Sequence, residues 1–292
     1  MKKKVLGALL GVVMAAGVLA GCSQTGAPKE STGEAGGASA QARTLDDIKE
    51  AGTIKIGVFS DKNPFGYVDS KGEIQGYDVY FAKRMAKDLL GSEDKVEFVY
   101  VEAASRVEYL KSAKVDVILA NFTVTDERKE QVDFALPYMK VALGVVSSDA
   151  NLITDVADLK DKTLIVVKGT TAETYFSEKH PEVKLLKFDE YQEAYDALLD
   201  GRGEAFSTDN TEVLAWAIQN KGFTVGIESI GNLDTIAPAV QMGNKELLDW
   251  INSEIETLGK EQFFHKNFKE TLKPVYGDEI DPENLVVEGG QI

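Results

Sequence analysis

Short apolar runs rich in β-branched residues recur between residues 44 and 275 and predict strands. Residues 115–121 (VDVILAN) are apolar at almost every position, which predicts a strand buried on both faces, as in a parallel sheet. The predicted strands are 53–60, 96–102, 115–121, 141–148, 163–169, 183–188, 204–208, 223–229 and 235–243.

Amphipathic segments lie between these runs and predict helices. Residues 77–90 place Phe81, Met85 and Leu89 on one stripe, and Gly91 supplies the stop. Further helices are predicted from the capping box at 44–47 to Gly52, over 105–114, from Thr125, over 171–180, 191–201 and 210–220, and around a stripe of Leu247, Leu248, Ile251, Ile255 and Leu258. Strands that alternate with helices, in two runs of roughly a hundred residues, indicate an α/β fold with two lobes and mainly parallel sheets.

The N-terminus has the pattern of an export signal. A basic start (KKK at 2–4) precedes an apolar stretch, 5–18, which is too short and too rich in glycine and alanine for a good membrane-spanning helix. The small residues before Cys22 resemble the bacterial lipobox, at which signal peptidase II cuts and lipid is attached to the cysteine sulfur; a secretory leader with an accidental cysteine is the alternative. We expect a lipoprotein signal peptide at 1–21 and a flexible tether at 22–43, so that the protein is exported and anchored to the membrane by lipid.

Charge and composition exclude several classes of function. The 292 residues contain 32 Lys and Arg against 48 Asp and Glu, a formal net charge of −16. Such an acidic surface repels phosphate backbones, so no nucleic-acid partner is expected. One cysteine rules out internal disulfides, and two distant histidines, His180 and His265, argue against a histidine-based metal centre. No nucleophile, phosphate-loop or cofactor motif is present, so the sequence predicts no metal, no cofactor and no enzyme.

Polar residues follow three predicted strands at their carboxyl ends, where ligands bind in open α/β sheets. Residues 121–128 (NFTVTDER) come after the buried strand, and Thr125 as N-cap would place Arg128 at the positive end of a helix. A cation is unfavourable there, which suggests that an anion belongs nearby. The alternative is a solvated arginine that Glu127 and Glu130 neutralise.

The other two strand ends carry threonine and aspartate. Thr170 and Thr171 open a helix whose free N–H groups can hold a carboxylate, or they form a capped tight turn. Asp209 either presents its carboxylate to a cationic ligand group or caps the next helix, with Glu212 completing a capping box.

Three side chains near other strand ends are further candidates. Arg106 is either a second anion-facing guanidinium or the partner of Glu102 or Glu108 in a salt bridge. Phe65 and Tyr67, in the loop after the first strand, either pack in the core or form a wall against the apolar stem of a ligand.

Together these segments resemble a known family. Residues 76–79 (GYDV), 121–128 (NFTVTDER) and 132–134 (VDF) are similar to the family 3 solute-binding proteins of polar amino-acid ABC importers, and the resemblance covers about residues 44–275. A finer similarity, to the cysteine-binding lipoprotein branch, lies at 168–172, 263–266 and 287–290.

The resemblance implies a two-lobed type II periplasmic binding protein fold. Each lobe would be a mainly parallel sheet flanked by helices, with two strand crossovers at the hinge. Lobe 1 would comprise 44–141 plus 234–275, and lobe 2 would comprise 142–233. The remaining residues, 276–292, are acidic with turn signals, from which we expect a loosely packed C-terminal tail.

The resemblance also implies roles for the candidate residues. The α-carboxylate of an amino acid would be bound by Arg128, with help from Thr123, Thr170 and Thr171, and its α-ammonium by Asp209 and the backbone carbonyl of Asn121. Other members stack an aromatic side chain on the ligand at a position near Lys62, which leaves Phe65 or Tyr67 for that role. Arg106 matches a position that some glutamate and aspartate binders use for the distal carboxylate, but the cysteine-binding branch carries arginine there too.

The implied function is capture rather than catalysis. The chain would be a monomeric substrate-binding component of an amino-acid ABC importer, which closes around a polar L-amino acid and docks on a permease with a cytoplasmic ATPase. Cysteine is the favoured ligand, and glutamate, aspartate or glutamine is the alternative. A secreted dehydratase on the same fold is the alternative outside transport.

Overall fold

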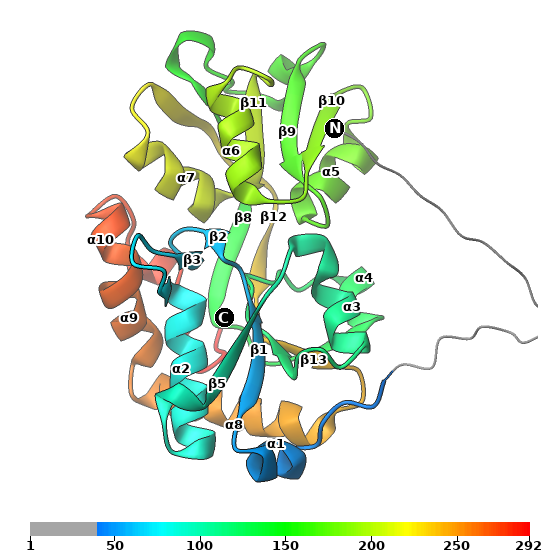
Figure 1. Cartoon of the computed structure of the whole chain (residues 1–292). Coiled ribbons are helices and arrows are strands. Elements are labelled where there is room, and N and C mark those ends of the chain that lie inside the picture. The colour runs from blue at the N-terminus through cyan, green and yellow to red at the C-terminus, as the bar shows by residue number, and fades with distance from the viewer. Residues whose placement is uncertain (1–39) are drawn as a thin grey trace, which may run out of the picture. The chain divides into compact units, whose positions relative to one another are not determined.

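The structure is a computed structural model that describes residues 40–292. The predicted signal peptide, Cys22 and most of the predicted tether lie outside the described residues. Figure 1 shows two lobes, each built around a five-stranded sheet with helices on its faces and joined by the long strands β8 (Met139–Ser148) and β12 (Phe223–Ile236). The predicted α/β class with two lobes is confirmed.

The sheet of lobe 1 has the strand order β5-β1-β6-β13-β7. Strands β5, β1 and β6 are parallel, so their carboxyl ends lie at one edge, and β13 pairs antiparallel with both β6 and β7. The bounds are β1 (Ile54–Val58), β5 (Val96–Tyr100), β6 (Val117–Ile118), β7 (Val132–Phe134) and β13 (Ala239–Gln241). Strand β6 is shorter than predicted but is buried on both faces, as expected.

The sheet of lobe 2 has the order β10-β9-β11-β8-β12 and again combines three parallel strands with two antiparallel pairings. Its remaining bounds are β9 (Thr163–Val167), β10 (Lys184–Phe188) and β11 (Ala205–Asp209). A small third sheet follows β1 in the chain and consists of β2 (Asp61–Lys62), β3 (Gly66–Val68) and β4 (Ile74–Gln75).

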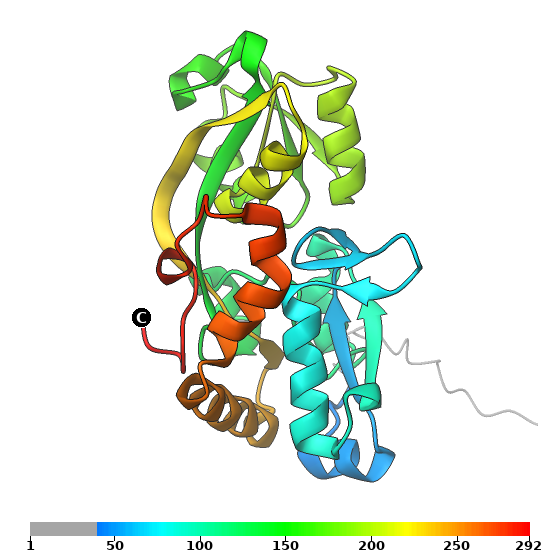
Figure 2. The same cartoon turned by 90° about the vertical axis from the view of Figure 1, so that its left-hand side faces the viewer.

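The helices cover the faces of the sheets. Figure 2 shows α2 beside the C-terminal helices, where Phe81 packs edge-on against Phe264 with ring centroids 5.0 Å apart. The helix bounds are α1 (Leu45–Ala51), α2 (Tyr77–Leu90), α3 (Arg106–Lys111), α4 (Asp126–Lys129), α5 (Thr171–Lys179), α6 (Tyr191–Leu199), α7 (Asn210–Gln219), α8 (Lys245–Lys260), α9 (Phe263–Asn267) and α10 (Lys273–Tyr276).

Local signals in the sequence set several helix ends correctly. Thr44 and Asp47 form the predicted capping box of α1, and Gly52 and Gly91 end α1 and α2 in the left-handed conformation that favours glycine. The predicted stripe of α8 is also confirmed, because Leu247, Ile251, Ile255 and Leu258 are buried in the core of lobe 1.

Residues 235–243 do not form a single strand as predicted. Thr235 and Ile236 end β12 in the sheet of lobe 2, whereas β13 belongs to the sheet of lobe 1. Pro238 lies between them and has no N–H to donate to a ladder. The chain therefore leaves one sheet at Ile236 and enters the other after the proline.

The prediction of a loosely packed C-terminal tail is wrong. Leu285, Val286 and Val287 are buried. The Lys140 N–H donates to the Leu285 carbonyl at 2.7 Å, and the Val287 N–H donates to the Tyr138 carbonyl at 3.1 Å. The tail therefore packs along the start of β8, where its apolar side chains extend the core of lobe 1.

A buried carboxyl group ties α2 to the edge of the sheet where a ligand would bind. Asp78, in the first turn of α2, accepts hydrogen bonds from the Asn121 N–H and the Tyr138 hydroxyl, both at 2.7 Å. Burial raises the pKa of Asp78 from 3.8 to about 7, although both bonds favour the ionised form.

This raised pKa predicts a fall in the free energy of unfolding as the pH rises from about 4 to about 7. In that range Asp78 keeps its proton in the native state but has lost it in the unfolded chain. The free energy of unfolding therefore falls by about 1.4 kcal/mol per pH unit. Asp78→Asn should flatten this slope in urea-unfolding curves, whereas Asn at the exposed Asp249 of α8 should not. An unchanged slope in Asp78→Asn would contradict the assignment.

Candidate functional site

Two arginines of lobe 1 meet one backbone carbonyl of lobe 2. The Arg106 Nη2 and the Arg128 Nη2 both donate to the Gly169 carbonyl, at 3.1 and 2.9 Å. Gly169 has a φ of +73°, and a Cβ built on it would lie 2.4 Å from the Ala104 Cα, so glycine is required for this approach. The structure thus brings together the strand-end segments that carry Arg106, Arg128 and Gly169.

Arg106 is held almost entirely by backbone carbonyls. Its Nε donates to Ala103 at 2.9 Å, and its Nη1 donates to Ala120 at 2.9 Å and to Asn121 at 3.3 Å. The alternative of a salt bridge to a neighbouring glutamate is wrong, because no acidic side chain within residues 40–292 forms an ion pair with this guanidinium. With Gly169 included, four of its five N–H groups are used, so Arg106 holds loops of both lobes in place.

The guanidinium of Arg128 has more N–H groups without a partner than that of Arg106. Thr125 caps α4 as predicted by accepting from the Arg128 N–H, and the Arg128 Nη1 donates to the Thr123 carbonyl at 2.7 Å. Two of the five guanidinium N–H groups are thus used within the described chain, which leaves three. No acidic side chain in that part of the chain pairs with Arg128, so neutralisation by Glu127 and Glu130 is not observed.

Both guanidiniums lie against the same aromatic ring. The Phe122 ring centroid is 4.4 Å from the Arg106 Cζ and 4.6 Å from the Arg128 Cζ. Burial and the nearby charge of Arg106 lower the pKa of Arg128 to about 9, while Asp209 acts in the opposite direction. A pair of cations this close, without a carboxylate between them, is a site prepared for an anion.

The acidic part of the site is occupied by a lysine that the motif analysis did not assign to it. The Lys62 Nζ lies 2.8 Å from the Asp209 Oδ2, 3.0 Å from the Glu212 Oε2 and 3.2 Å from the Tyr191 hydroxyl. The capping alternative for Asp209 is wrong: its side chain makes no bond to the start of α7, and Glu212 faces Lys62 instead. Only the position of Lys62, where the family aligns an aromatic residue, indicated that it could belong to the site.

Asn121 and Thr123 follow β6, which ends at Ile118, three residues before Asn121. Both are buried, with φ +45° at Asn121. The Asn121 carbonyl already accepts from Arg106, yet neither its side-chain amide nitrogen nor its amide oxygen has a partner within residues 40–292. A buried amide without a partner in the chain is able to bond to a small polar molecule, either a water or a ligand. Thr123 contributes its carbonyl, which accepts from Arg128.

Of the two threonines at 170 and 171, Thr170 has the predicted capping role, and the carboxylate role stays a prediction. The Thr170 hydroxyl accepts from the Glu173 N–H and donates to the Val167 carbonyl, so it caps α5. Thr171 is the first residue of α5 and lines a cavity together with Arg128.

The two predicted aromatic residues differ in their surroundings. Phe65 is buried in the core of lobe 1, and the Lys62 Nζ lies 5.9 Å from its ring centroid. Tyr67 pairs with Asp61 and Gln75 in the small sheet, and burial and Asp69 raise its pKa. No hydrogen bond or aromatic contact links its side chain to Arg128 or Asp209 within the described residues.

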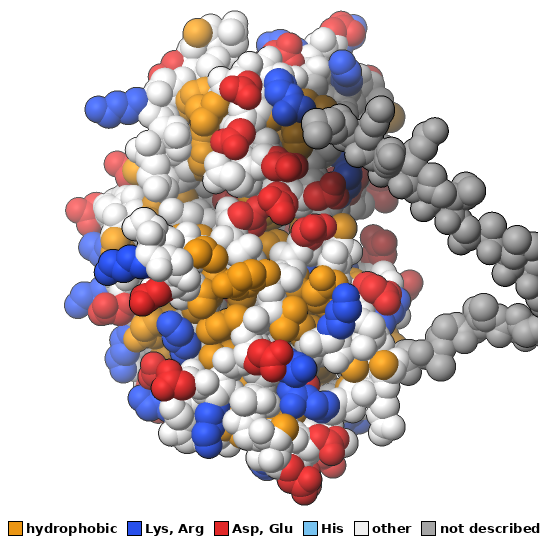
Figure 3. Space-filling view, viewed as in Figure 1, with side chains coloured by type: hydrophobic (Ala, Val, Ile, Leu, Met, Phe, Trp, Pro, Cys, Tyr) orange, Lys and Arg blue, Asp and Glu red, His pale blue; other side chains and the backbone are white. Residues whose placement is uncertain are grey.

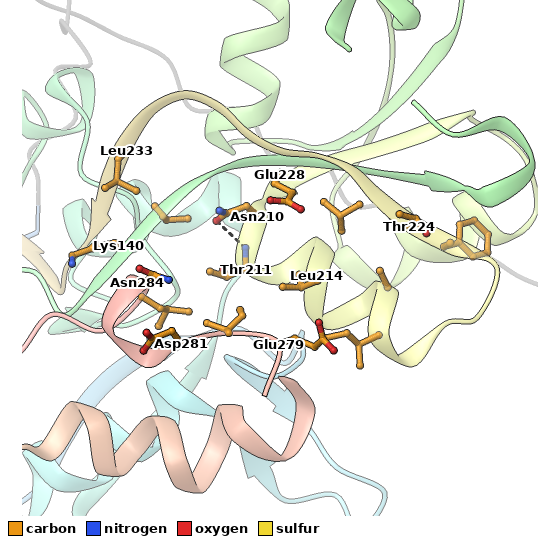
Figure 4. Close-up of a pocket in the computed structure, with 17 residues that line it drawn as sticks. Lys140, Asn210, Thr211, Leu214, Thr224, Glu228, Leu233, Glu279, Asp281 and Asn284 are labelled. Atoms are coloured by element: carbon orange, nitrogen blue, oxygen red, sulfur yellow. Dashed lines mark hydrogen bonds between the residues drawn. The ribbon is translucent and has the colours of Figure 1, made fainter. Parts of the chain in front are cut away.

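Two large cavities differ in their relation to these residues. One of about 520 Å³ lies against Arg128 and receives Thr171 and Tyr175 from lobe 2 and Asp234 from the hinge. The other, of about 580 Å³, lies between α7, the hinge strands and the C-terminal segment, and contains none of the predicted site residues (Figure 4). The cavity against Arg128 is therefore the one that belongs to the site.

Acidic side chains gather across the middle of the face shown in Figure 3. A small cavity of about 130 Å³, lined by both lobes, includes the acidic residues Asp61, Glu102, Asp189 and Glu190. Phe59 lines this cavity too, and its ring centroid is 5.5 Å from the Arg106 Cζ, so the acidic cavity lies close to that guanidinium. Within residues 40–292 the helices are too short or too polar to cross a membrane.

Comparison with known proteins agrees with this geometry. Residues 54–271 match the profile of the bacterial extracellular solute-binding proteins, family 3. A crystal structure of a solute receptor for L-cysteine of Neisseria gonorrhoeae is 58% identical with a TM-score of 0.83, over 84% of this chain and 100% of that chain. A cysteine-binding protein from Campylobacter jejuni is 56% identical with the same TM-score, over 84% and 98%.

A curated relative gives a second comparison over nearly the full length. The glutamine-binding protein of a Bacillus subtilis ABC transporter is 34% identical over 276 residues, which are 93% of this chain and 98% of that protein. On the match to the family profile and on these relatives, the chain belongs to the bacterial extracellular solute-binding proteins of family 3.

Proposed function

We propose that the chain binds a free polar amino acid between its lobes and delivers it to an ABC importer. The observation that carries this proposal is the positive charge at Gly169, where two guanidiniums meet without an acidic partner in residues 40–292. A ligand carboxylate would supply the missing negative charge, and the three remaining N–H groups of Arg128 suit paired, charge-assisted bonds.

Asp209 is the proposed partner of the ligand ammonium. Its Oδ2 is bonded to Lys62, but its Oδ1 accepts no bond from the described residues. Arg128 belongs to lobe 1 and Asp209 to lobe 2, for which we propose the residue bounds 44–141 plus 234–275 and 142–233. A zwitterion would satisfy both groups only when the lobes are closed, so its binding would favour the closed state.

We propose L-cysteine as the ligand. The support is the 56–58% identity to two proteins named for cysteine, which is well above the identity to the relative named for glutamine. The buried Asn121 side-chain amide is uncharged, has no partner within the described residues, and can both donate to and accept from a small polar side chain.

Glutamine is the second candidate, because the Bacillus subtilis relative is named for it, and glutamate or aspartate is the third. We propose no catalysis, although a dehydratase on this fold is an alternative that a search for a converted product would detect. Lipid anchoring at Cys22, export, a monomeric state and docking on a permease with an ATPase complete the proposal.

Calorimetric titration with L-cysteine under reducing conditions, L-cystine, L-glutamine, L-glutamate and L-aspartate tests the choice of ligand. We expect L-cysteine to bind tightest and to be the amino acid that co-purifies in native mass spectrometry. Tighter binding of L-glutamine or L-glutamate would contradict the assignment of cysteine as the ligand. It would leave the proposal of an amino-acid site unchanged.

Arg128→Ala should weaken amino-acid binding by about 100-fold or more, since it removes the proposed carboxylate fork. The free energy of unfolding should change by less than about 1 kcal/mol, because the lost bonds are offset by relief of the repulsion from Arg106. Titration and urea unfolding measure the two quantities, and Lys129→Ala, on the exposed side of α4, is the control. Retained affinity in Arg128→Ala would refute the assignment.

Arg106→Ala should behave differently, because it leaves buried backbone carbonyls without a donor. We expect the free energy of unfolding to fall by about 3 kcal/mol, and the affinity for cysteine, glutamine and glutamate to fall together. A loss confined to glutamate and aspartate would instead assign Arg106 to a distal carboxylate.

A further inference from the structure

The ammonium group of Lys62 lies in a cage that both lobes build. The cage consists of the rings of Phe59, Phe65 and Tyr191 and the carboxylates of Asp209 and Glu212. The Lys62 Nζ is 4.5 Å from the Tyr191 ring centroid and 5.4 Å from that of Phe59, and it lies within 3.0 Å of both carboxylates. Aromatic faces combined with carboxylates are a recognition site for a cation.

Two acidic side chains face the one ammonium of Lys62, and the Glu212 Oε1 is buried without a partner within residues 40–292. Burial alone would lower the pKa of Lys62, but Asp209 and Glu212 outweigh it and hold that pKa above its usual value. Burial raises the pKa of Glu212 to about 7, in spite of Lys62, so Glu212 carries only part of its negative charge at neutral pH. The charges of the cage are therefore close to balance with Lys62 in place, and the cage favours a cation at the position that Lys62 fills.

The position of the cage connects it to the ligand site. Asp209 supplies its Oδ2 to the cage, and its Oδ1 is the atom that we assign to the ligand ammonium. Lys62 is 1% exposed and reaches the cage from β2 of lobe 1, whereas both carboxylates belong to lobe 2. The cage and the proposed ammonium site therefore share the Asp209 carboxylate.

We propose that the cage is a subsite for the primary ammonium of a basic side chain, such as that of L-lysine, and that Lys62 fills it from within the chain. Lys62 thereby excludes basic amino acids from the cleft. The exclusion of basic amino acids rests on the proposed function. The preference of the cage for a cation does not depend on that function.

Vacating the cage tests its preference. Lys62→Ala opens the space and leaves two carboxylates without a cation, whereas Lys62→Met fills the space without a charge. Thermal unfolding is measured in methylammonium chloride and, at equal ionic strength, in tetramethylammonium chloride, whose cation is too large for the space of one lysine ammonium.

We expect methylammonium to raise the unfolding temperature of Lys62→Ala by several degrees over tetramethylammonium, and to leave the wild type and Lys62→Met unchanged. If Lys62→Ala does not fold, the same comparison is made with Lys62→Ala combined with Glu212→Gln, which buries less unpaired charge. An equal change in unfolding temperature with the two cations would contradict the proposal that the cage is a subsite for a primary ammonium.

Titration with amino acids tests the exclusion. L-Lysine should bind Lys62→Ala at least about tenfold more tightly than it binds the wild type or Lys62→Met, and L-norleucine, which lacks the terminal ammonium, should show no gain. No gain for L-lysine would overturn the role of Lys62 in specificity. Failure of the wild type to bind any amino acid would instead refute the proposed function. The methylammonium comparison would still test the preference of the cage for a cation.

Discussion

Two positive charges that share one carbonyl oxygen are the constraint on which the arrangement of the site depends. The Gly169 oxygen accepts from Arg106 and Arg128 of the opposite lobe, and a Cβ at Gly169 would collide with the Ala104 backbone. The neutral carbonyl and the Phe122 ring attract both cations but neutralise neither. Within residues 40–292 neither guanidinium is therefore in an ion pair, and the two positive charges stay close to each other.

The other contacts between the lobes are both polar and apolar. Lys62 pairs with Asp209 and Glu212, while the Asp61 carboxylate accepts from the Tyr191 N–H at 2.7 Å, at the start of α6. The Phe59 ring packs edge-on against the Tyr191 ring with centroids 5.3 Å apart, within an apolar cluster that draws residues from both lobes. Water can replace the polar bonds if the lobes separate, whereas the apolar contacts would then lose their burial. The two long strands β8 and β12 connect the lobes.

Sequence reasoning succeeded where the deciding interaction is local. The capping box at Thr44, the glycine stops and the cap at Thr125 involve residues within a few positions of each other. The segment 121–128 was also assigned correctly to a sheet edge, since strand ends can be predicted from the alternation of strands and helices.

It failed where the partner is distant in the chain. Asp209 looks like a helix cap beside Glu212, but its actual partner, Lys62, is 147 residues away. Arg106 has glutamates as neighbours and yet bonds to four carbonyls, one of them in the other lobe. The sequence of the C-terminal tail is acidic, which suggested loose packing, but the tail forms backbone hydrogen bonds with the start of β8. Burial decides each of these cases, and burial depends on the tertiary fold.

The contrast between the surface and the site bears on the kind of ligand that can enter. The chain carries a formal charge of −16, and acidic residues line a small cavity between the lobes near the cationic groups. At physiological salt the field of a surface charge falls off over about 8 Å, so only the acidic residues close to the cleft act on a ligand there. If the chain binds an amino acid as proposed, these residues would disfavour a ligand with a net negative charge more than a zwitterion without net charge. This electrostatic argument would favour cysteine or glutamine over glutamate and aspartate, and it does not depend on the resemblance to other proteins.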